Sequence, residues 1–554
     1  MRYVREGSIL LVMALGLVPA VWGQGGRAGR AAQQQQPQQP PPQQQAAPAG
    51  RGGRGAEPAP ATNEFFNYDT SAGAGMPVPG GEPAETHQKI TANGETLAYT
   101  VRVGYMPLRN ATTGQSEAHL FYTAYSKEGV DDPSGRPLVF FVAGAPGVAA
   151  AWQEFGGLGP KRMKWANDGT AGVAPYGWSD NPGTLLGHAD LVFANPVGTA
   201  FSRPDQPGHG PSFWNTAADV ASMAEFVRSY INANNRRNSP LFVAGEDLGT
   251  GRAAGLAAYL IEHQIPVRGV MLLSMTMSPD ALAGDTQYLT LAPSLIMAAW
   301  YHKKLSPELN AMSAEQISGQ ARTFASREYL HALYKGDRMT ADERAKAVAD
   351  LSRLTGLSKA VVVNNDLRIT LERFNGELMR DQHRGLANSD ARVTGFMPAM
   401  PGGGRGGRGA FGPPPAPIDF NESNLAGGFQ AAYETYLHRE LSFNGNNGIF
   451  YLSNGGVGTF TSTGNDDASL AGAFARNPNL RLFVAVNYFD LNAPFFATEF
   501  TLAHLNVSPE VRGHSITVSH YEAGQMAYVD NKALAKLQGD LGRFVSQAVS
   551  PTRQ

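Results

Sequence analysis

The stretch Leu241-Phe242-Val243-Ala244-Gly245-Glu246-Asp247-Leu248-Gly249-Thr250 decides how this chain folds. A short apolar run ends in Gly-x-Asp-x-Gly, and an Ala- and Leu-rich segment follows at residues 252–263. The pattern predicts a strand, a sharp turn and a helix, with glycines two before and two after the centre so that strand and helix approach closely. This is the pattern of a nucleophile elbow, whose central residue is held in a strained conformation at the top of a parallel sheet. The centre here is Asp247, where serine is usual.

Length and composition bound the class of protein. The chain has 554 residues, 42% hydrophobic and 17% charged, which suffices for one large core with an insertion or for two domains. Lys+Arg 45 and Asp+Glu 47 give a formal charge of -2, so no global field favours nucleic acid or an anionic membrane. The chain has no cysteine, which excludes disulfides, thiolate zinc sites and a cysteine nucleophile.

The N-terminal region predicts export. Residues 1–23 combine a basic start, an apolar run at 9–21 and a small-residue cleavage site after Gly23, as in a cleaved signal peptide. The run is shorter than the roughly 20 residues that cross a bilayer, and no other stretch is long and apolar enough, so we expect no membrane span. Residues 24–62 are rich in Gln, Pro, Gly and Arg and are expected to form a disordered linker. The mature protein is expected in the periplasm or outside the cell.

Hydrophobic patterns predict an α/β core. Residues 87–125 alternate apolar and polar positions around Asn93-Gly94, which predicts antiparallel strands. Further apolar runs alternate with helical patterns such as residues 215–234, which predicts a mostly parallel sheet flanked by helices. These runs lie at residues 138–142, 191–194, 241–244 and 269–273. Residues 63–273 are therefore expected to form the first part of the core.

The pattern changes after residue 273. Residues 274–429 read as helices with no convincing strand, which predicts an inserted helical cap, and residues 401–417 read as a flexible Gly- and Pro-rich loop within it. Strand patterns resume at residues 480–486 and 515–520, and a helix is expected at 532–549. Residues 430–554 are therefore expected to form the second part of the core.

Five segments resemble, in the same order, those of the serine carboxypeptidase family. They are residues 137–147 with Leu158-Gly159-Pro160 downstream, residues 190–202, the elbow, residues 488–494, and Tyr521-Glu522-Ala523-Gly524-Gln525-Met526. Five linked segments are more specific than one motif. The resemblance covers roughly residues 65–550. It implies an α/β-hydrolase fold with an inserted helical cap, and a family activity of removing C-terminal residues from peptides.

The resemblance also implies which residues occupy the catalytic positions. The family's serine, aspartate and histidine correspond to Asp247, Asp490 and Gln525. In such a triad serine attacks, histidine moves the proton, and aspartate orients the histidine. The side-chain amide of Gln525 does not titrate near neutral pH and cannot act as a general base. We therefore expect serine-type catalysis to be impaired.

The substrate-binding positions have changed as well. The resemblance places the binding of a peptide's terminal carboxylate at Ala143, Gly144 and Glu246, and Ala143 replaces an asparagine that donates hydrogen bonds. It assigns the oxyanion hole to the backbone N–H groups of Ala145 and Leu248, which do not depend on side-chain identity. The resemblance implies no cofactor and no metal ion.

Asp247 is expected to make the pocket acidic. A carboxylate at the start of a helix is favoured by the helix dipole and the free N–H groups, so we expect Asp247 to stay ionised and to reach into the oxyanion hole. Together with Glu246 and Asp490, it should disfavour a peptide's terminal carboxylate.

Three functions remain open. The leading interpretation is an exported, catalytically silent relative that binds a peptide or small molecule in its cleft. A second is a hydrolase of esters, epoxides or haloalkanes with Asp247 as the nucleophile; His520, five residues before Gln525, is expected to face core or solvent rather than to supply the base. A third is residual serine carboxypeptidase activity through Ser202 or Ser274, neither of which has a visible base.

Overall fold

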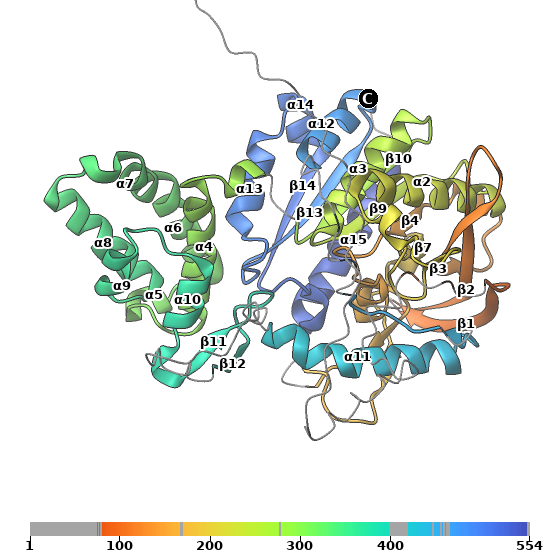
Figure 1. Ribbon diagram of the computed structural model, residues 1–554, viewed down its shortest axis with the longest axis horizontal. Helices are drawn as coiled ribbons and strands as arrows, with labels where there is room; N and C mark the ends of the chain where they lie inside the picture. Colours follow the sequence, from red (N-terminus) through yellow and green to blue (C-terminus); the bar gives the residue numbers. More distant parts are fainter. Residues whose placement is uncertain are drawn as a thin grey trace, which may run out of the picture. The chain divides into compact units, whose positions relative to one another are not determined.

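The computed structural model describes residues 80–92, 94–166, 170–275, 279–397, 419–445, 448–454 and 466–550, with Gly75, Pro77, Val457 and Phe460. These residues belong to one compact unit, residues 66–554. The expected signal peptide at 1–23, the linker at 24–62 and the loop at 401–417 lie outside the described residues. Figure 1 shows the arrangement of the helices and strands within the unit.

A ten-stranded sheet forms the centre of the described part of the chain. Its order is β1 (Ala84–Ala92), β2 (Glu95–Arg109), β3 (Ser116–Lys127), β7 (Asp190–Ala194), β4 (Leu138–Phe141), β9 (Leu241–Glu246), β10 (Val267–Leu273), β13 (Arg481–Asn487) and β14 (Ile516–Tyr521), with β8 (Arg203–Pro204) paired to β3. In this spatial order, neighbouring strands from β1 to β7 pair antiparallel. Neighbouring strands from β7 onward to β14 pair parallel. Every residue of β4, β7 and β9 is buried, as expected for parallel strands covered on both faces. The predicted mostly parallel sheet is confirmed.

Helices cover both faces of this sheet (Figure 1). Helices α2 (Thr216–Ala233), α3 (Gly249–Glu262) and α12 (Asp466–Arg476) share one hydrophobic cluster with alternate strand residues such as Val243. Helices α11 (Phe420–Arg439) and α15 (Asn531–Val549) share the other cluster with Phe242 and Ala244. The alternation follows from the two-residue period of a strand, which sends successive side chains to opposite faces.

Seven helices lie between β10 and the hairpin β11–β12 in the described chain. They are α4 (Thr286–Tyr301), α5 (Pro307–Asn310), α6 (Ala314–Phe324), α7 (Leu330–Lys335), α8 (Ala341–Thr355), α9 (Lys359–Asn364) and α10 (Leu371–Glu377). Helix α4 packs against α13 (Phe495–His504) of the core. Smaller elements are α1 (Ala151–Gln153), β5 (Lys161–Met163), β6 (Trp178–Asp180) and α14 (Pro509–Ser515). No helix in the described part combines the length and apolarity that a membrane crossing requires.

Two details of the segment 274–429 differ from expectation. Strands β11 (Arg384–Leu386) and β12 (Thr394–Phe396) form an antiparallel hairpin where no strand was expected, because three residues are too few to show an alternating pattern. The expected boundary after residue 429 falls inside α11, whose Leu425 and Tyr436 pack in the same cluster as α15.

Candidate functional site

The elbow has the expected strained geometry. Strand β9 ends at Glu246, helix α3 begins at Gly249, and Asp247 between them has φ 52°. A Cβ at Gly245 would overlap the carbonyl oxygen of Gly249, and one at Gly249 would overlap that of Ala143. Larger residues at these two positions would therefore force strand, helix and neighbouring loop apart.

An arginine of α3 holds the neighbouring loop against the elbow. Arg252 is buried and donates hydrogen bonds to the carbonyl oxygens of Val142 and Gly144 at 2.9 and 2.8 Å. Its Nε donates to Asp219 Oδ2 of α2 at 2.5 Å. Ala143, with φ 63°, lies between the two held carbonyls. The loop that follows β4 is thus fixed beside the turn that follows β9.

A cavity of about 900 Å³ opens at this end of the sheet. Five of the positions named from the sequence line it: Gly144, Ala145, Glu246, Asp247 and Gln525. They come from three regions that are far apart in the chain. Their roles in binding or catalysis remain predictions, but the structure brings these five positions together.

The other three named positions adjoin the cavity without lining it. Ala143 is a buried residue of the loop that follows β4, and Leu248 has 56% of its surface exposed. Asp490 is fully buried. Its charge raises the pKa of Glu246, and the charge of Asp247 raises the pKa of Asp490.

Asp490 is satisfied by groups other than a histidine. Ser274 Oγ donates to its Oδ2 at 2.5 Å, and the backbone N–H groups of Asn492 and Ala493 donate to its Oδ1 at 2.9 and 3.0 Å. Burial raises the pKa of Asp490 to about 7, although these donors lower it, and the charge of Asp247 adds to the rise. The carboxylate is therefore enclosed by its own partners.

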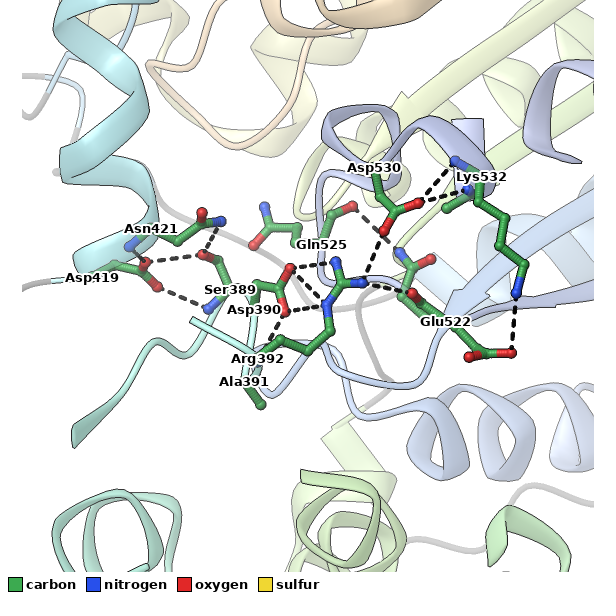
Figure 2. A network of polar contacts seen from close by, with 12 residues as sticks. Ser389, Asp390, Ala391, Arg392, Asp419, Asn421, Glu522, Gln525, Asp530 and Lys532 are labelled. Carbon is green, nitrogen blue, oxygen red and sulfur yellow. Dashed lines mark hydrogen bonds and ion pairs between the residues drawn. The ribbon is translucent and has the colours of Figure 1, made fainter. Parts of the chain in front are cut away.

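Gln525 is held by different groups. Its backbone N–H donates to the carbonyl oxygen of Ser389 at 2.6 Å, and its carbonyl oxygen accepts from Asn487 Nδ2 at 3.3 Å. Its side-chain Oε1 accepts from Asn492 Nδ2 at 3.3 Å. Figure 2 shows Gln525 beside the segment from Ser389 to Arg392. None of these described hydrogen bonds joins the amide of Gln525 to Asp490.

No histidine is among the described residues that line the cavity. His520 Nε2 lies 2.7 Å from Glu499 Oε1, and its ring stacks on Tyr488 with centroids 5.6 Å apart. His302 Nε2 lies 2.7 Å from the carbonyl oxygen of Ala391. Both rings are thus engaged in packing outside the cavity, as expected for His520.

The serines considered as replacement nucleophiles do not line the cavity either. Ser202 Oγ donates to the carbonyl oxygen of Asn195 at 2.7 Å and accepts from the backbone N–H of Phe121 at 2.8 Å. Ser274 is buried and bound to Asp490. Ser389 does line the cavity, but its hydroxyl donates to Asp419 Oδ1 at 2.9 Å.

Two carboxyl groups that line the cavity, Glu246 and Asp247, have raised pKa values. Burial raises the pKa of Glu246 to about 8, the charges of Asp247 and Asp490 add to the rise, and the hydrogen bond from Tyr528 Oη opposes it. Burial raises the pKa of Asp247 to about 6; the backbone N–H of Leu248 lowers it and the charge of Glu422 raises it. Asp247 is thus mostly ionised at neutral pH, and its donor is one of the N–H groups expected to form the oxyanion hole.

Asn487, Tyr528 and Glu422 were not found from the sequence, and Ser274 was named only as an alternative nucleophile and not as a partner of Asp490. Ser274 follows β10 directly and Asn487 ends β13, so the shared carboxyl edge of two adjacent parallel strands could have placed them together. Tyr528 lies beyond the last motif, and Glu422 begins α11. No local signal connects these two with the elbow, because only the packing of α11 and α15 against the core brings them there.

Comparison with known proteins agrees with this geometry. The family model described as serine carboxypeptidase matches residues 93–367. The chain belongs to the serine carboxypeptidase family. The membership implied by the five motifs is thereby confirmed.

A solved carboxypeptidase structure shows the same fold. Kex1, a prohormone-processing carboxypeptidase from Saccharomyces cerevisiae, matches with a TM-score of 0.52 and 13% identity, over 81% of this chain and 91% of that chain. A monoglyceride lipase from Saccharomyces cerevisiae matches with a TM-score of 0.33 and 10% identity, over 81% and 95%. Juvenile hormone epoxide hydrolase from Bombyx mori matches with a TM-score of 0.32 and 12% identity, over 81% and 79%. The fold is the α/β-hydrolase fold, as the sequence implied.

Proposed function

We propose that this chain is a catalytically silent member of the serine carboxypeptidase family that acts as a binding protein. The observation that carries the proposal is the composition of the cavity. Its elbow presents Asp247 in place of a serine, Gln525 replaces the histidine, and no histidine lines its described wall. A serine-type reaction needs both an attacking hydroxyl and a proton carrier at one point.

The enclosure of Asp490 supports the same proposal. In an active triad this acid orients the histidine. Here it receives its hydrogen bonds from Ser274, Asn492 and Ala493. Asp490 therefore has hydrogen-bond donors without an imidazole, which supports the proposal that no histidine serves it.

The cavity itself is suited to binding. Its volume of about 900 Å³ lies in the range of ligand sites in proteins. Its wall includes the aromatic side chains of Trp152, Phe396 and Tyr528. A scaffold that keeps the pocket but not the catalytic groups retains recognition without turnover.

A second candidate is a hydrolase with Asp247 as the nucleophile. It is favoured by the strained position of Asp247 in the cavity wall and by a pKa of about 6, which leaves the carboxylate ionised at neutral pH. Such an enzyme forms an ester that a base-activated water must cleave. No base stands at Gln525, so the ester would accumulate.

Export is part of the proposal. The basic start, the apolar run at residues 9–21 and the small residues before position 24 favour a cleaved signal peptide. Mass spectrometry of the mature protein would show a new N-terminus at Gln24, and an unprocessed N-terminus in an exporting host would contradict it.

Turnover of blocked dipeptides tests the proposed function. We expect the rate to lie on the order of a million-fold below that of an active family member, because nucleophile and base are both missing. Asp247→Ala should leave the residual rate unchanged. Turnover that Asp247→Ala abolishes would contradict silence and favour the Asp247 nucleophile.

Intact-mass measurement after exposure to a haloalkane or an epoxide separates the two candidates. The silent protein should keep its mass. A covalent adduct that is absent from Asp247→Ala would establish the trapped ester and overturn the proposed function.

A further inference from the structure

Glu154 is a buried acid that does not line the cavity. It begins the π-helical segment Glu154–Leu158, directly after α1, and only 2% of its surface is exposed. No lysine, arginine or histidine among the described residues affects its ionisation. A buried carboxylate without a basic partner is costly to keep ionised, so the groups that surround it decide its charge.

Tyrosine hydroxyls surround this carboxyl group. Tyr125 of β3 donates to its Oε1 at 2.6 Å, and Tyr433 of α11 donates to its Oε2 at 2.7 Å. The Oη of Tyr436, about one turn further along α11, lies 3.2 Å from the Oη of Tyr125. Glu154 therefore joins helix α11 to the central sheet through hydrogen bonds from both.

The cluster can satisfy both charge states of Glu154. The ionised carboxylate accepts the two tyrosine hydroxyls, whereas the protonated carboxyl group must also donate one hydrogen bond. Thr123 lies beside Glu154, and its Oγ1 is buried and has no hydrogen-bond partner in the described part of the chain. This oxygen is a free acceptor for the proton, so the protonated form fits without an unpaired donor.

The ionised form is the costly one. Burial raises the pKa of Glu154 to about 7, although the hydroxyls of Tyr125 and Tyr433 lower it. Burial also raises the pKa values of Tyr125, Tyr433 and Tyr436 well above their usual range, and the charge of Glu154 adds to each rise. The charge of Tyr99 of β2 adds to the rise for Tyr436. Glu154 is therefore the member of this cluster that titrates near neutral pH.

The same face of α11 packs on the core through aromatic rings. Phe429 stacks on Trp152 with centroids 4.2 Å apart, and Tyr436 stacks on Phe155 with centroids 5.1 Å apart. Phe429 and Tyr436 are seven residues apart, about two turns of a helix, so they share one face. Glu154 is thus an acid placed within an aromatic interface between α11 and the core.

This interface extends to the cavity. Trp152, on which Phe429 stacks, lines the cavity, and so do Asp419 and Glu422 at the start of α11. A movement of α11 relative to the core would therefore change the shape of the cavity wall.

We propose that Glu154 is a pH-sensitive switch that holds α11 against the core when it is protonated and loosens the helix when it is ionised. The folded protein favours the protonated acid, so the hold is tightest below pH 4.5 and is lost as the pH rises through about 7. The consequence for ligand binding rests on the proposed function, because α11 supplies part of the proposed binding cavity. The response of the helix itself does not depend on that function.

Other charged groups along α11 are separated from Glu154 by position. Glu422 and Asp247, whose charges repel each other, lie at the cavity end of the helix. Glu440 lies at the other end, 3.8 Å from Lys161. Residues 429–437 lie between these ends, so their response reports mainly on Glu154.

Amide hydrogen exchange of the full chain without ligand tests the switch. Rates are measured at pH 5.5 and pH 8.5 and are divided by the intrinsic rates of the unfolded chain. We expect the protection of residues 429–437 to fall on the order of 30-fold between the two pH values, since an acid with a raised pKa is favoured in its protonated form. Helix α2, which packs on the opposite face of the sheet, is the internal control and should not change.

Three variants assign the response to Glu154. Glu154→Gln cannot ionise but can still accept from the tyrosines, so it should abolish the fall in protection. Glu434→Gln is the matched control, because Glu434 is exposed on the same helix, and it should keep the fall. Tyr433→Phe removes a donor that favours the ionised form, so the transition should move to higher pH. Tyr433→Phe also tests the switch if Glu154→Gln does not fold, as judged by circular dichroism.

Three results would overturn the inference. They are equal protection of residues 429–437 at both pH values, a fall that persists in Glu154→Gln or is lost in Glu434→Gln, and a transition that does not move to higher pH in Tyr433→Phe. Turnover of blocked dipeptides would instead overturn the proposed function and leave the switch in place, so the two failures are distinguishable.

Discussion

Two groups of buried or half-buried acids in this molecule differ in how they are neutralised. In the core, Asp190 accepts from Arg136 at 2.7 Å and from Arg236 at 2.6 Å, and Asp219 accepts from Arg252 at 2.5 Å. At the cavity, Glu246, Asp247 and Asp490 have no basic partner among the described residues, and their pKa values rise to about 8, 6 and 7. Acids of the same chain are thus either paired with arginine or left without a basic partner among the described residues.

The difference separates acids that fix a basic partner from acids that have none among the described residues. A buried acid paired with arginine fixes the position of its partner, and Arg252 in turn holds the loop that adjoins the cavity. An unpaired buried acid lowers stability whenever it is ionised. Titratable groups with shifted pKa values often lie at functional sites, where the loss of stability is tolerated.

The largest expected effect breaks a core pair. Asp219→Ala would leave Arg252 buried without its carboxylate, and we expect a loss of about 3–5 kcal/mol in the free energy of unfolding. Urea unfolding followed by circular dichroism measures it. The matched control is Asp366→Ala, which breaks exposed pairs with Arg344 and Arg368 and should cost about 0–1 kcal/mol. Equal losses in the two variants would contradict the structural role of Asp219.

The second effect is a pH dependence of stability with a definite sign. The pKa of Glu246 is raised in the folded protein from 4.5 to about 8, so folding disfavours its ionised form. Its contribution to stability is greatest below pH 4.5 and is lost as the pH rises towards 8. Glu246→Gln cannot ionise but can still accept from Tyr528.

We therefore expect Glu246→Gln to be more stable than the unmodified protein above about pH 8, by about 2–3 kcal/mol, and equally stable below about pH 4.5. The value is reduced because Asp247 and Asp490 titrate with Glu246. Unfolding midpoints measured across this range in both proteins check it. Parallel curves with no convergence at acid pH would show that Glu246 is not perturbed as described.

A smaller effect concerns Ser274, whose hydroxyl donates to Asp490. Ser274→Ala removes a 2.5 Å hydrogen bond to a buried carboxylate and should cost about 1–2 kcal/mol, mainly above pH 7, where Asp490 is ionised. Unfolding at acid and alkaline pH measures the loss. Ser212→Ala, in which an exposed hydroxyl bonded only locally is removed, serves as the control. A loss that is the same at both pH values would separate Ser274 from the titration of Asp490.

Much of the framework could be predicted because its signals are local. The apolar runs of β4, β7, β9 and β10, the glycines on both sides of Asp247 and the order of the motifs fixed the sheet and the position of the elbow. A turn with φ 52° at a non-glycine residue followed from the same pattern.

The remaining features depend on contacts between distant parts of the chain. Ser274 and Asp490 are 216 residues apart, and no pattern in either segment announces their hydrogen bond. Glu422 joins the cavity because α11 packs on the core. Strands β11 and β12 pair through only three residues each, too few for a periodic signal.

Labelling of the unmodified protein with a serine-reactive phosphonate, read by intact mass, tests the loss of serine chemistry most directly. We predict no increase in mass under conditions that fully label an active carboxypeptidase of the family, because the elbow presents the carboxylate of Asp247 and no histidine is among the described residues that line the cavity. An adduct of one phosphonate that disappears in Ser274→Ala or Ser389→Ala would contradict this and show that a serine of the site still reacts.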